Sequence, residues 1–270
     1  MGRGRQILDL RVDKPHSARM YDYLLGGKTH YPADREAAVK ATEGWPGLPT
    51  AARANRAFLH RAVRYLVRQA GVRQFLDIGT GIPTSPNLHE VAQAEDPSAR
   101  VVYADNDPIV LAHARALLRG TGQGRTAYLD ADLRQPRSLL EQPELAATLD
   151  LAEPVALTII ATVHFVPDHH DPFGAVATLM EALPSGSFLL LSHATPDFSP
   201  EEINKAVAAY HAGGIEAQVR THRGILPFFD GLDLLDPGLV LITDWHPDTS
   251  PFGTPTDSDV SFYGGLAKKP

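Results

Sequence analysis

The sequence predicts an α/β protein in which a mostly parallel sheet carries helices on both faces. Short apolar runs alternate with helical patterns from Gln74 to the end of the chain. Several of these runs are continuously apolar, as expected for strands that are covered on both faces. The first 73 residues show only helical patterns, so we expect an N-terminal helical cap over the sheet.

Seven strands are expected in the body of the protein. They are the segments QFLDIG, RVVYAD, TAYLDAD, PVALTIIATVHF, SFLLLSHA, GLVLITDW and SFYGGLA, with the last at an edge of the sheet.

Four junctions show where helices should begin. Each has a side chain with a capping oxygen followed by proline at the first helical position: Ser85-Pro86, Asp107-Pro108, Asp171-Pro172 and Ser199-Pro200. Glu202 lies three residues after Ser199 and would complete a capping box. The helix that follows Asp107 is expected to end at Gly120.

The cap and the body differ in charge. Residues 1–73 hold 14 Lys and Arg against 6 Asp and Glu, whereas residues 74–270 hold 11 against 26. A basic front suits either a nucleic-acid partner or a solvated helix face, and the second reading is favoured. We expect the cap, 1–73, to pack on the body, 74–270, rather than to fold alone.

The composition limits the class of protein. The 270 residues include no cysteine, which excludes disulfides, thiolate catalysis and cysteine-bound zinc. No apolar run approaches the roughly 20 residues that cross a bilayer, and the N-terminus shows no apolar leader. We therefore expect a cytoplasmic protein without a membrane partner.

The segment FLDIGTGIPT runs from the first strand into the turn after it, the position where doubly wound folds bind nucleotides. Pro83 lacks an N–H, the third glycine of a dinucleotide fingerprint is absent, and Asp77 would repel a pyrophosphate. S-adenosylmethionine (SAM) is cationic and has no phosphate, so it suits Asp77, Gly79 and Gly81 better than NAD does. Asp77 could instead serve only to hold the turn.

Further polar side chains follow the next two strands. Asp105 ends the second strand beside Asn106 and can accept hydrogen bonds from ribose hydroxyls. Asp132 follows the third strand, where an acid can accept from the adenine amino group. Carboxyl ends of parallel strands meet at one edge of a sheet, so these acids should line one crevice with Asp77.

The sequence resembles a family of SAM-dependent methyltransferases first catalogued as a domain of unknown function. The resemblance runs from Lys14 to Lys268 and rests on ARMYDYLLGGKTHYPADREAA, FLDIGTGIPT, VVYADNDPIVLAHARALL and HFVPD. It implies a Rossmann-like methyltransferase fold whose N-terminal helices close over SAM. It also places four residues of the front motif where this lid meets the ligand: Tyr21, Tyr23, Gly26 and Gly27.

Two histidines are candidate general bases. His164 follows the fourth strand and His193 ends the fifth, and histidine titrates near neutral pH. His164 is preferred because the loop after the fourth strand commonly faces the transferred methyl group. Either ring could instead be buried and hydrogen-bonded to backbone. No metal is expected, because the adjacent residues 168–171 of a short loop rarely converge on one ion.

The leading functional hypothesis is a SAM-dependent methyltransferase that acts on a small molecule. The alternatives are an RNA or protein methyltransferase that uses the basic front, and a non-catalytic SAM-binding protein whose lid reports the cofactor level. A nucleic-acid partner is disfavoured because no aromatic RNA-binding signature accompanies the arginines.

Overall fold

A computed structural model describes residues 11–117, 122–248 and 255–270. It contains an eight-stranded sheet with the order β3-β2-β1-β4-β5-β8-β6, and β7 also pairs with β8. The strands are β1 Gln74–Ile78, β2 Arg100–Asp105, β3 Arg125–Asp130, β4 Ala156–Ile160, β5 Phe188–Ala194, β6 Asp233–Leu234, β7 Val240–Leu241 and β8 Phe262–Lys268. Strands β1 to β5 are parallel and β8 is antiparallel to β5, which confirms the predicted fold class.

The α-helices of the described residues lie between and around these strands. They are α1 Ser17–Leu24, α2 Pro32–Gly44, α3 Leu48–Arg68, α4 Leu88–Glu95, α5 Pro108–Leu117, α6 Pro136–Leu140, α7 Pro143–Thr148, α8 Pro172–Glu181, α9 Pro200–Ala212, α10 His222–Ile225 and α11 Asp257–Val260. Short 3-10 turns are η1 Val163–Phe165, η2 Asp168–His170 and η3 Leu226–Phe229. Among these described helices, none is long and apolar enough to cross a membrane.

The C-terminal strands differ from the prediction. The run GLVLITDW forms only the two-residue β7, and β8 lies inside the sheet between β5 and β6 rather than at its edge. A β-carbon at Gly264 would lie 2.6 Å from the Phe58 ring, so this strand needs glycine where α3 crosses it. Gly264 therefore reflects close packing of β8 against α3.

Three predicted helix starts are confirmed and one is wrong. Helices α5, α8 and α9 begin at the predicted prolines. Helix α4 begins at Leu88 instead of Pro86, because Asn87 forms a capping box with Glu90. A capping box pairs two backbone N–H groups at the start of a helix with side chains, which favours the start at Leu88.

The caps themselves follow the prediction at Asp107 and Asp171, whose carboxylates accept the N–H groups of Ile109 and Gly174. Ser199 differs, because its hydroxyl donates to the Glu202 carboxylate instead of accepting from backbone. Gly120, the expected end of α5, lies outside the described residues.

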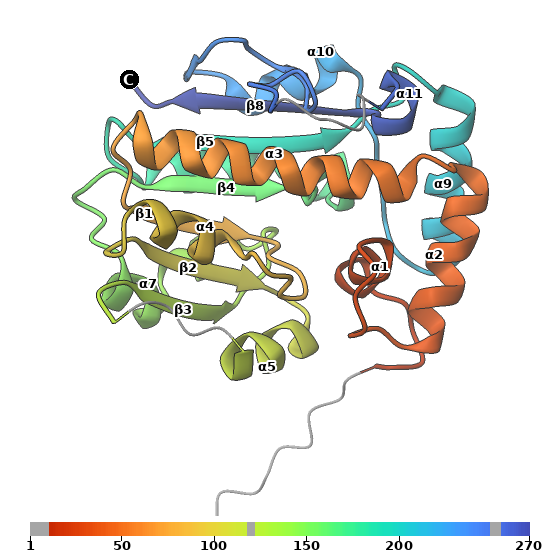
Figure 1. The fold of residues 1–270 in the computed structure, drawn as a ribbon, viewed down its shortest axis with the longest axis horizontal. Coiled ribbons are helices and arrows are strands. Elements are labelled where there is room, and N and C mark those ends of the chain that lie inside the picture. Colours follow the sequence, from red (N-terminus) through yellow and green to blue (C-terminus); the bar gives the residue numbers. More distant parts are fainter. Residues whose placement is uncertain (1–10, 118–121, 249–254) are drawn as a thin grey trace, which may run out of the picture.

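The cap covers the ends of the parallel strands. Figure 1 shows α1 and α2 beyond the arrowheads of β4 and β5, with α9 beside α2, and α3 running across the sheet. Buried residues of α3 share one apolar cluster with β1, β2 and β5, and Phe58 meets Trp245 edge to face at 5.5 Å. Each such buried side chain contributes about 1.5–3 kcal/mol, so α3 anchors the cap firmly on the sheet.

Candidate active site

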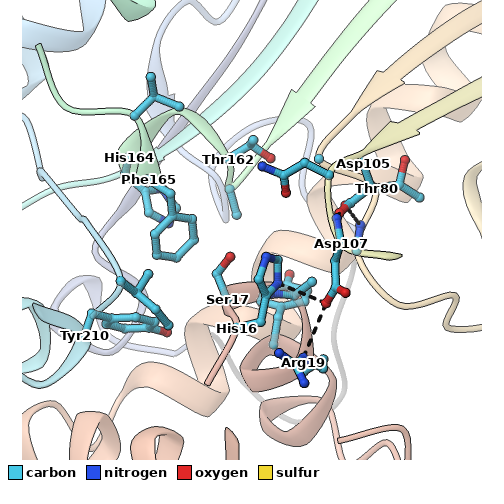
Figure 2. Close-up of a pocket in the computed structure, with 18 of the residues that line it drawn as sticks. His16, Ser17, Arg19, Thr80, Asp105, Asp107, Thr162, His164, Phe165 and Tyr210 are labelled. Atoms are coloured by element: carbon cyan, nitrogen blue, oxygen red, sulfur yellow. Dashed lines mark hydrogen bonds and ion pairs between the residues drawn. The ribbon is translucent and has the colours of Figure 1, made fainter. Parts of the chain in front are cut away.

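A cavity of about 1000 Å³ lies at the carboxyl ends of the parallel strands, beneath the cap. The glycine loop after β1, the end of β2, and the loops after β3 and β4 form one side, and α1, α3 and α9 contribute the other. Figure 2 shows Asp105 and Asp107 on one side of this cavity, and His164, Phe165 and Tyr210 across from them. The site is therefore acidic at one end and aromatic at the other.

Asp77 is buried at the end of β1 and lines the cavity. Its Oδ1 accepts a hydrogen bond from Thr158 Oγ1 at 2.5 Å. Burial raises the pKa of Asp77 to about 6, while the hydrogen bond from Thr158 and the charge of Arg56 act in the opposite direction. A cationic ligand would stabilise this buried carboxylate, because a nearby positive charge favours the ionised form of a carboxyl group.

The glycine loop needs both of its predicted glycines. Gly79 and Gly81 have φ of +69° and +70°, a region that favours glycine. A β-carbon at Gly79 would lie 2.3 Å from the hydroxyl of Thr162, whereas one at Gly81 would meet only open space. Gly81 N–H donates to Asp105 Oδ2 at 2.8 Å, so the loop is tied to the end of β2.

The structure brings the other predicted acids to the same cavity. Asp105 is buried, and its Oδ1 accepts the N–H of Asp107 at 2.9 Å. Asn106 donates to Asp132 at 3.3 Å, and Arg134 also binds that carboxylate. Asp77, Asp105, Asn106 and Asp132 all line the cavity, while their contacts with a ligand remain predictions.

Four side chains, which we name the cap latch, join the cap to the sheet edge: His16, Arg19, Asp34 and Asp107. Arg19 Nε lies 3.3 Å from Asp107 Oδ2 (Figure 2) and 3.5 Å from Asp34 Oδ1. His16 Nδ1 lies 3.2 Å from the same Asp107 oxygen. Sequence reasoning assigned Asp107 only to helix capping, which uses Oδ1 and leaves Oδ2 for the latch.

Of the predicted lid residues, Tyr21 alone lines the cavity. Its hydroxyl donates to Ala52 O at 3.0 Å and accepts from Asn55 Nδ2 at 3.1 Å. Asn55 also accepts from Ser192 Oγ at 2.6 Å, so a buried polar chain links α1, α3 and β5. Asn55 lies inside α3, and its partners are distant in the chain, so no local pattern of the sequence indicates them.

Tyr23, Gly26 and Gly27 do not line the cavity, and the contacts with the ligand predicted for them remain predictions. Gly26, at φ +79°, and Gly27 donate their N–H groups to Tyr23 O and Asp22 O, which is the Schellman end of α1. A β-carbon at Gly27 would lie 2.0 Å from the Asp22 carboxylate. Gly26 and Gly27 therefore form the C-terminal cap of α1.

His164 lies in η1, beyond the end of β4, and lines the cavity. Its side chain is buried, and neither ring nitrogen has a hydrogen-bond partner among the described residues. Burial, followed by the charge of Arg220, lowers the pKa of His164 to about 3. The ring is therefore neutral at physiological pH.

His193 stands at the end of β5, as predicted, but does not line the cavity, and its predicted role as a base remains a prediction. The side chain is completely buried, with Nδ1 2.7 Å from Ala194 O and Nε2 2.8 Å from Arg220 Nη1. Both ring nitrogens of His193 therefore have partners within the protein. His193 instead helps to hold Arg220, which also binds Asp168 at 2.6 Å.

In the loop after β4, the acids and the histidines bind different partners. Asp168 binds Arg220 and Asp171 caps α8. His169 Nε2 and His170 Nε2 lie 3.1 and 3.0 Å from the carboxylate oxygens of Glu216. These three side chains form a group that could hold a metal ion, and the absence of a metal remains a prediction.

The arginines of α3 bind neighbouring parts of the protein. Arg64 pairs with Asp248 at 3.4 Å and Arg68 pairs with Glu95 at 2.5 Å. Arg56 lines the cavity and donates to the carbonyl oxygens of Thr84 and Pro86. The basic front therefore fastens the helix to the body, and Arg56 brings a positive charge to the glycine loop.

Comparison with known proteins relates the chain to methyltransferases. A family model described as S-adenosyl methyltransferase matches residues 4–270. A DUF574 family protein from Streptomyces avermitilis is 51% identical, with a TM-score of 0.94 over 97% of this chain and 100% of that one. A candidate methyltransferase from Thermobifida fusca is 36% identical, with a TM-score of 0.88 over 96% and 97%.

A more distant structure shares the fold alone. The plantazolicin methyltransferase BpumL, in complex with SAH, is 13% identical, with a TM-score of 0.52 over 94% of this chain and 95% of that one. No curated protein matches the sequence.

Proposed function

The chain belongs to the S-adenosyl methyltransferase family, and we propose that it transfers the methyl group of SAM to a small-molecule acceptor. The observation that carries the proposal is the cavity of about 1000 Å³ between the cap and the sheet. Small-molecule sites usually fall at about 300–1,000 Å³, so this one suits a cofactor and a small acceptor together. The enzyme is a SAM-dependent methyltransferase, and its acceptor is the part that we propose.

The residues of the acidic end fit SAM. Asp77 offers a buried carboxylate to the ammonium group, and Arg56 offers a guanidinium to the methionine carboxylate. Gly81 leaves open space where the backbone can approach the ligand. These groups suit a zwitterionic amino acid, whereas a pyrophosphate would meet Asp77 unfavourably.

The acids at the ends of β2 and β3 fit the adenosyl part. Asp105 would accept from the ribose hydroxyls, since each carboxylate oxygen has a second lone pair beyond its bond to a backbone N–H. Asp132, oriented by Asn106, would accept from the adenine amino group. When bound, SAM supplies a methyl group on a positively charged sulfur.

The protein aligns the reactants and excludes water. The cap latch holds α1 over the cavity, and positioning of this kind lowers the barrier by removing the entropy cost of alignment. His164 would accept the proton of an acceptor that loses one. We do not extend this role to His193, whose nitrogens are both engaged.

Calorimetric titration with SAM, SAH and NAD tests the cofactor site. We expect SAM and SAH to bind and NAD to bind at least about 100-fold more weakly, because its pyrophosphate would face Asp77. The variant Asp105→Ala should weaken SAM binding while the fold persists. NAD binding tighter than that of SAM would contradict the proposal.

Incubation with methyl-labelled SAM and a fractionated cell extract tests the class of acceptor. We expect the label in the small-molecule fraction. Label in the RNA or protein fraction would replace the small-molecule proposal with one of the alternatives, and SAM binding without label transfer to any fraction would indicate a non-catalytic SAM-binding protein.

A further inference from the structure

The end of the cavity opposite the acids consists of aromatic rings. We name His164, Phe165, Tyr210 and Phe262 the aromatic wall, and all four line the cavity. Ring centroids lie 5.4 Å apart for Tyr210 and Phe165, 4.3 Å for Phe165 and His164, and 5.6 Å for His164 and Phe262. The wall is thus continuous from α9 through η1 to β8. Its members His164, Phe165 and Tyr210 lie across the cavity from Asp105 and Asp107 (Figure 2).

The aromatic wall lacks a counter-ion for a charged acceptor. Among the described residues, no carboxylate, ammonium or guanidinium makes a hydrogen bond, ion pair or ring contact with its four side chains, whose contacts are with other rings. Glu216 lines the cavity, but its carboxylate contacts His169 and His170. Arg220 acts on His164 through space and pairs with Asp168 at 2.6 Å. A charge buried against this wall would be unpaired, which is costly.

Two polar groups of the wall are free. His164 Nδ1 is buried without a partner, and Nε2 also has no hydrogen bond among the described residues but is not fully buried. The hydroxyl of Tyr210 likewise has no partner among those residues and is not fully buried. Because both side chains line the cavity, these atoms can meet a ligand there.

We propose that the acceptor is an uncharged aromatic molecule with a hydroxyl group, bound with its ring on the aromatic wall and its hydroxyl between His164 and Tyr210. The inference rests on the proposed function. Aromatic faces and edges attract another ring in stacked or edge-to-face arrangements, which gives the wall its preference for a flat acceptor.

Methyl transfer to such an acceptor needs only SAM, the acceptor hydroxyl and a group that takes the hydroxyl proton. The acceptor oxygen forms a bond to the methyl carbon while the bond from that carbon to sulfur breaks, and sulfur keeps the electron pair. The hydroxyl proton passes to His164 Nε2 and from there to solvent. His164 is a weak base because burial lowers its pKa to about 3, so it suits a phenolic or enolic hydroxyl better than an aliphatic one.

Three naphthalene probes of matched shape test the inference by binding. In the presence of saturating SAH, we expect 1-naphthol to bind at least about tenfold more tightly than 1-naphthoate or the cationic 1-naphthylmethylamine, because a charge on the probe would be unpaired. Methyl transfer to 1-naphthol, measured by mass spectrometry, should give 1-methoxynaphthalene. Equal or tighter binding of a charged probe, or binding of none of the three, would overturn the inference.

Variants of the aromatic wall test which side chains bind 1-naphthol and which one accepts its proton. Tyr210→Phe keeps the ring and should weaken 1-naphthol binding about tenfold, whereas Tyr65→Phe, outside the cavity, should leave it unchanged. His164→Gln should lower the rate of transfer by about 100-fold, the usual contribution of a general base. Unchanged transfer in His164→Gln would remove His164 from the step.

The same titrations separate the two proposals. Failure of SAH itself to bind would contradict the proposed function. Normal SAH binding together with a preference for a charged probe, or with no probe bound, would contradict only the aromatic acceptor.

Discussion

Asp77 places a buried carboxylate in the cavity, where it accepts a hydrogen bond from Thr158. Replacement by asparagine removes the charge and keeps the shape. Since hydrogen bonds to charged groups contribute about 1.5–3 kcal/mol, we expect Asp77→Asn to weaken SAM binding by about 10- to 100-fold in calorimetry. Asp130→Asn is the matched control, because Asp130 is exposed at the end of β3 and does not line the cavity. Equal effects of both changes would argue against a charge contact at Asp77.

The raised pKa of Asp77 also predicts a pH dependence. In the free protein the carboxyl has a pKa of about 6, because burial outweighs the hydrogen bond from Thr158 and the charge of Arg56, while Asp105 adds to the rise. Below pH 6 the group is mostly protonated and neutral, so a cation loses its partner. We expect SAM affinity to fall about tenfold from pH 7 to pH 5, since one pH unit below the pKa leaves about a tenth of the groups ionised. The Asp77→Asn variant should lack this dependence, and a dependence of the same size in that variant would assign it to another group.

At the scale of elements, the cap latch holds α1 against the start of α5. Arg19 is buried between the carboxylates of Asp34 and Asp107. Removing one partner of a buried ion pair costs about 3–5 kcal/mol, because the other charge stays buried. We expect Arg19→Met to lower the free energy of unfolding by that amount, measured by urea denaturation. Amide hydrogen exchange in α1 should also become faster. Arg35→Met, at an exposed position of α2, should change it by less than about 0.5 kcal/mol. Wild-type stability of Arg19→Met would show that the latch does not hold the cap.

The end of α1 gives a second test at this scale. Gly26 has a positive φ in open space, whereas a β-carbon at Gly27 would overlap the Asp22 carboxylate. Asp22 Oδ2 also accepts the N–H of Thr29 at 2.8 Å, so it cannot move without breaking the turn. We expect Gly26→Ala to cost about 1–2 kcal/mol in thermal unfolding and Gly27→Ala to cost more. The reverse order would mean that the backbone angle, rather than the contact with Asp22, limits the motif.

On the scale of the whole molecule, the cavity lies between the cap and the sheet, so a ligand there contacts both. A ligand that binds only the folded protein at 100 times its Kd stabilises it by about 2.7 kcal/mol. For a chain of this size that corresponds to a rise in Tm of roughly 5–10 °C. We expect SAH to produce this rise in scanning calorimetry and NAD at the same concentration to produce none. A rise confined to NAD would contradict the cofactor assignment.

Much of the fold could be predicted because its signals are local. The apolar runs set the positions of β1, β2 and β5, and the capping side chains of Asp107 and Asp171 set the starts of α5 and α8. The same locality explains the wrong start of α4, since Ser85-Pro86 and Asn87 both carry a capping signal and only their partners decide between them. The place of β8 inside the sheet depends on pairing with β5, a segment far away in the chain.

The candidate site also contains residues that local patterns predict and residues that only packing places. The sequence alone determined that Asp77, Asp105 and Asp132 would meet at one edge, because parallel strands place their carboxyl ends together whatever packs around them. Only the tertiary structure decided that His164 lines the cavity while His193 binds Arg220, since both stand near the carboxyl ends of apolar strands and differ in their neighbours. Tyr210 and Arg19 reach the site from helices distant in the chain, and packing against the sheet, rather than any local pattern, brings them there.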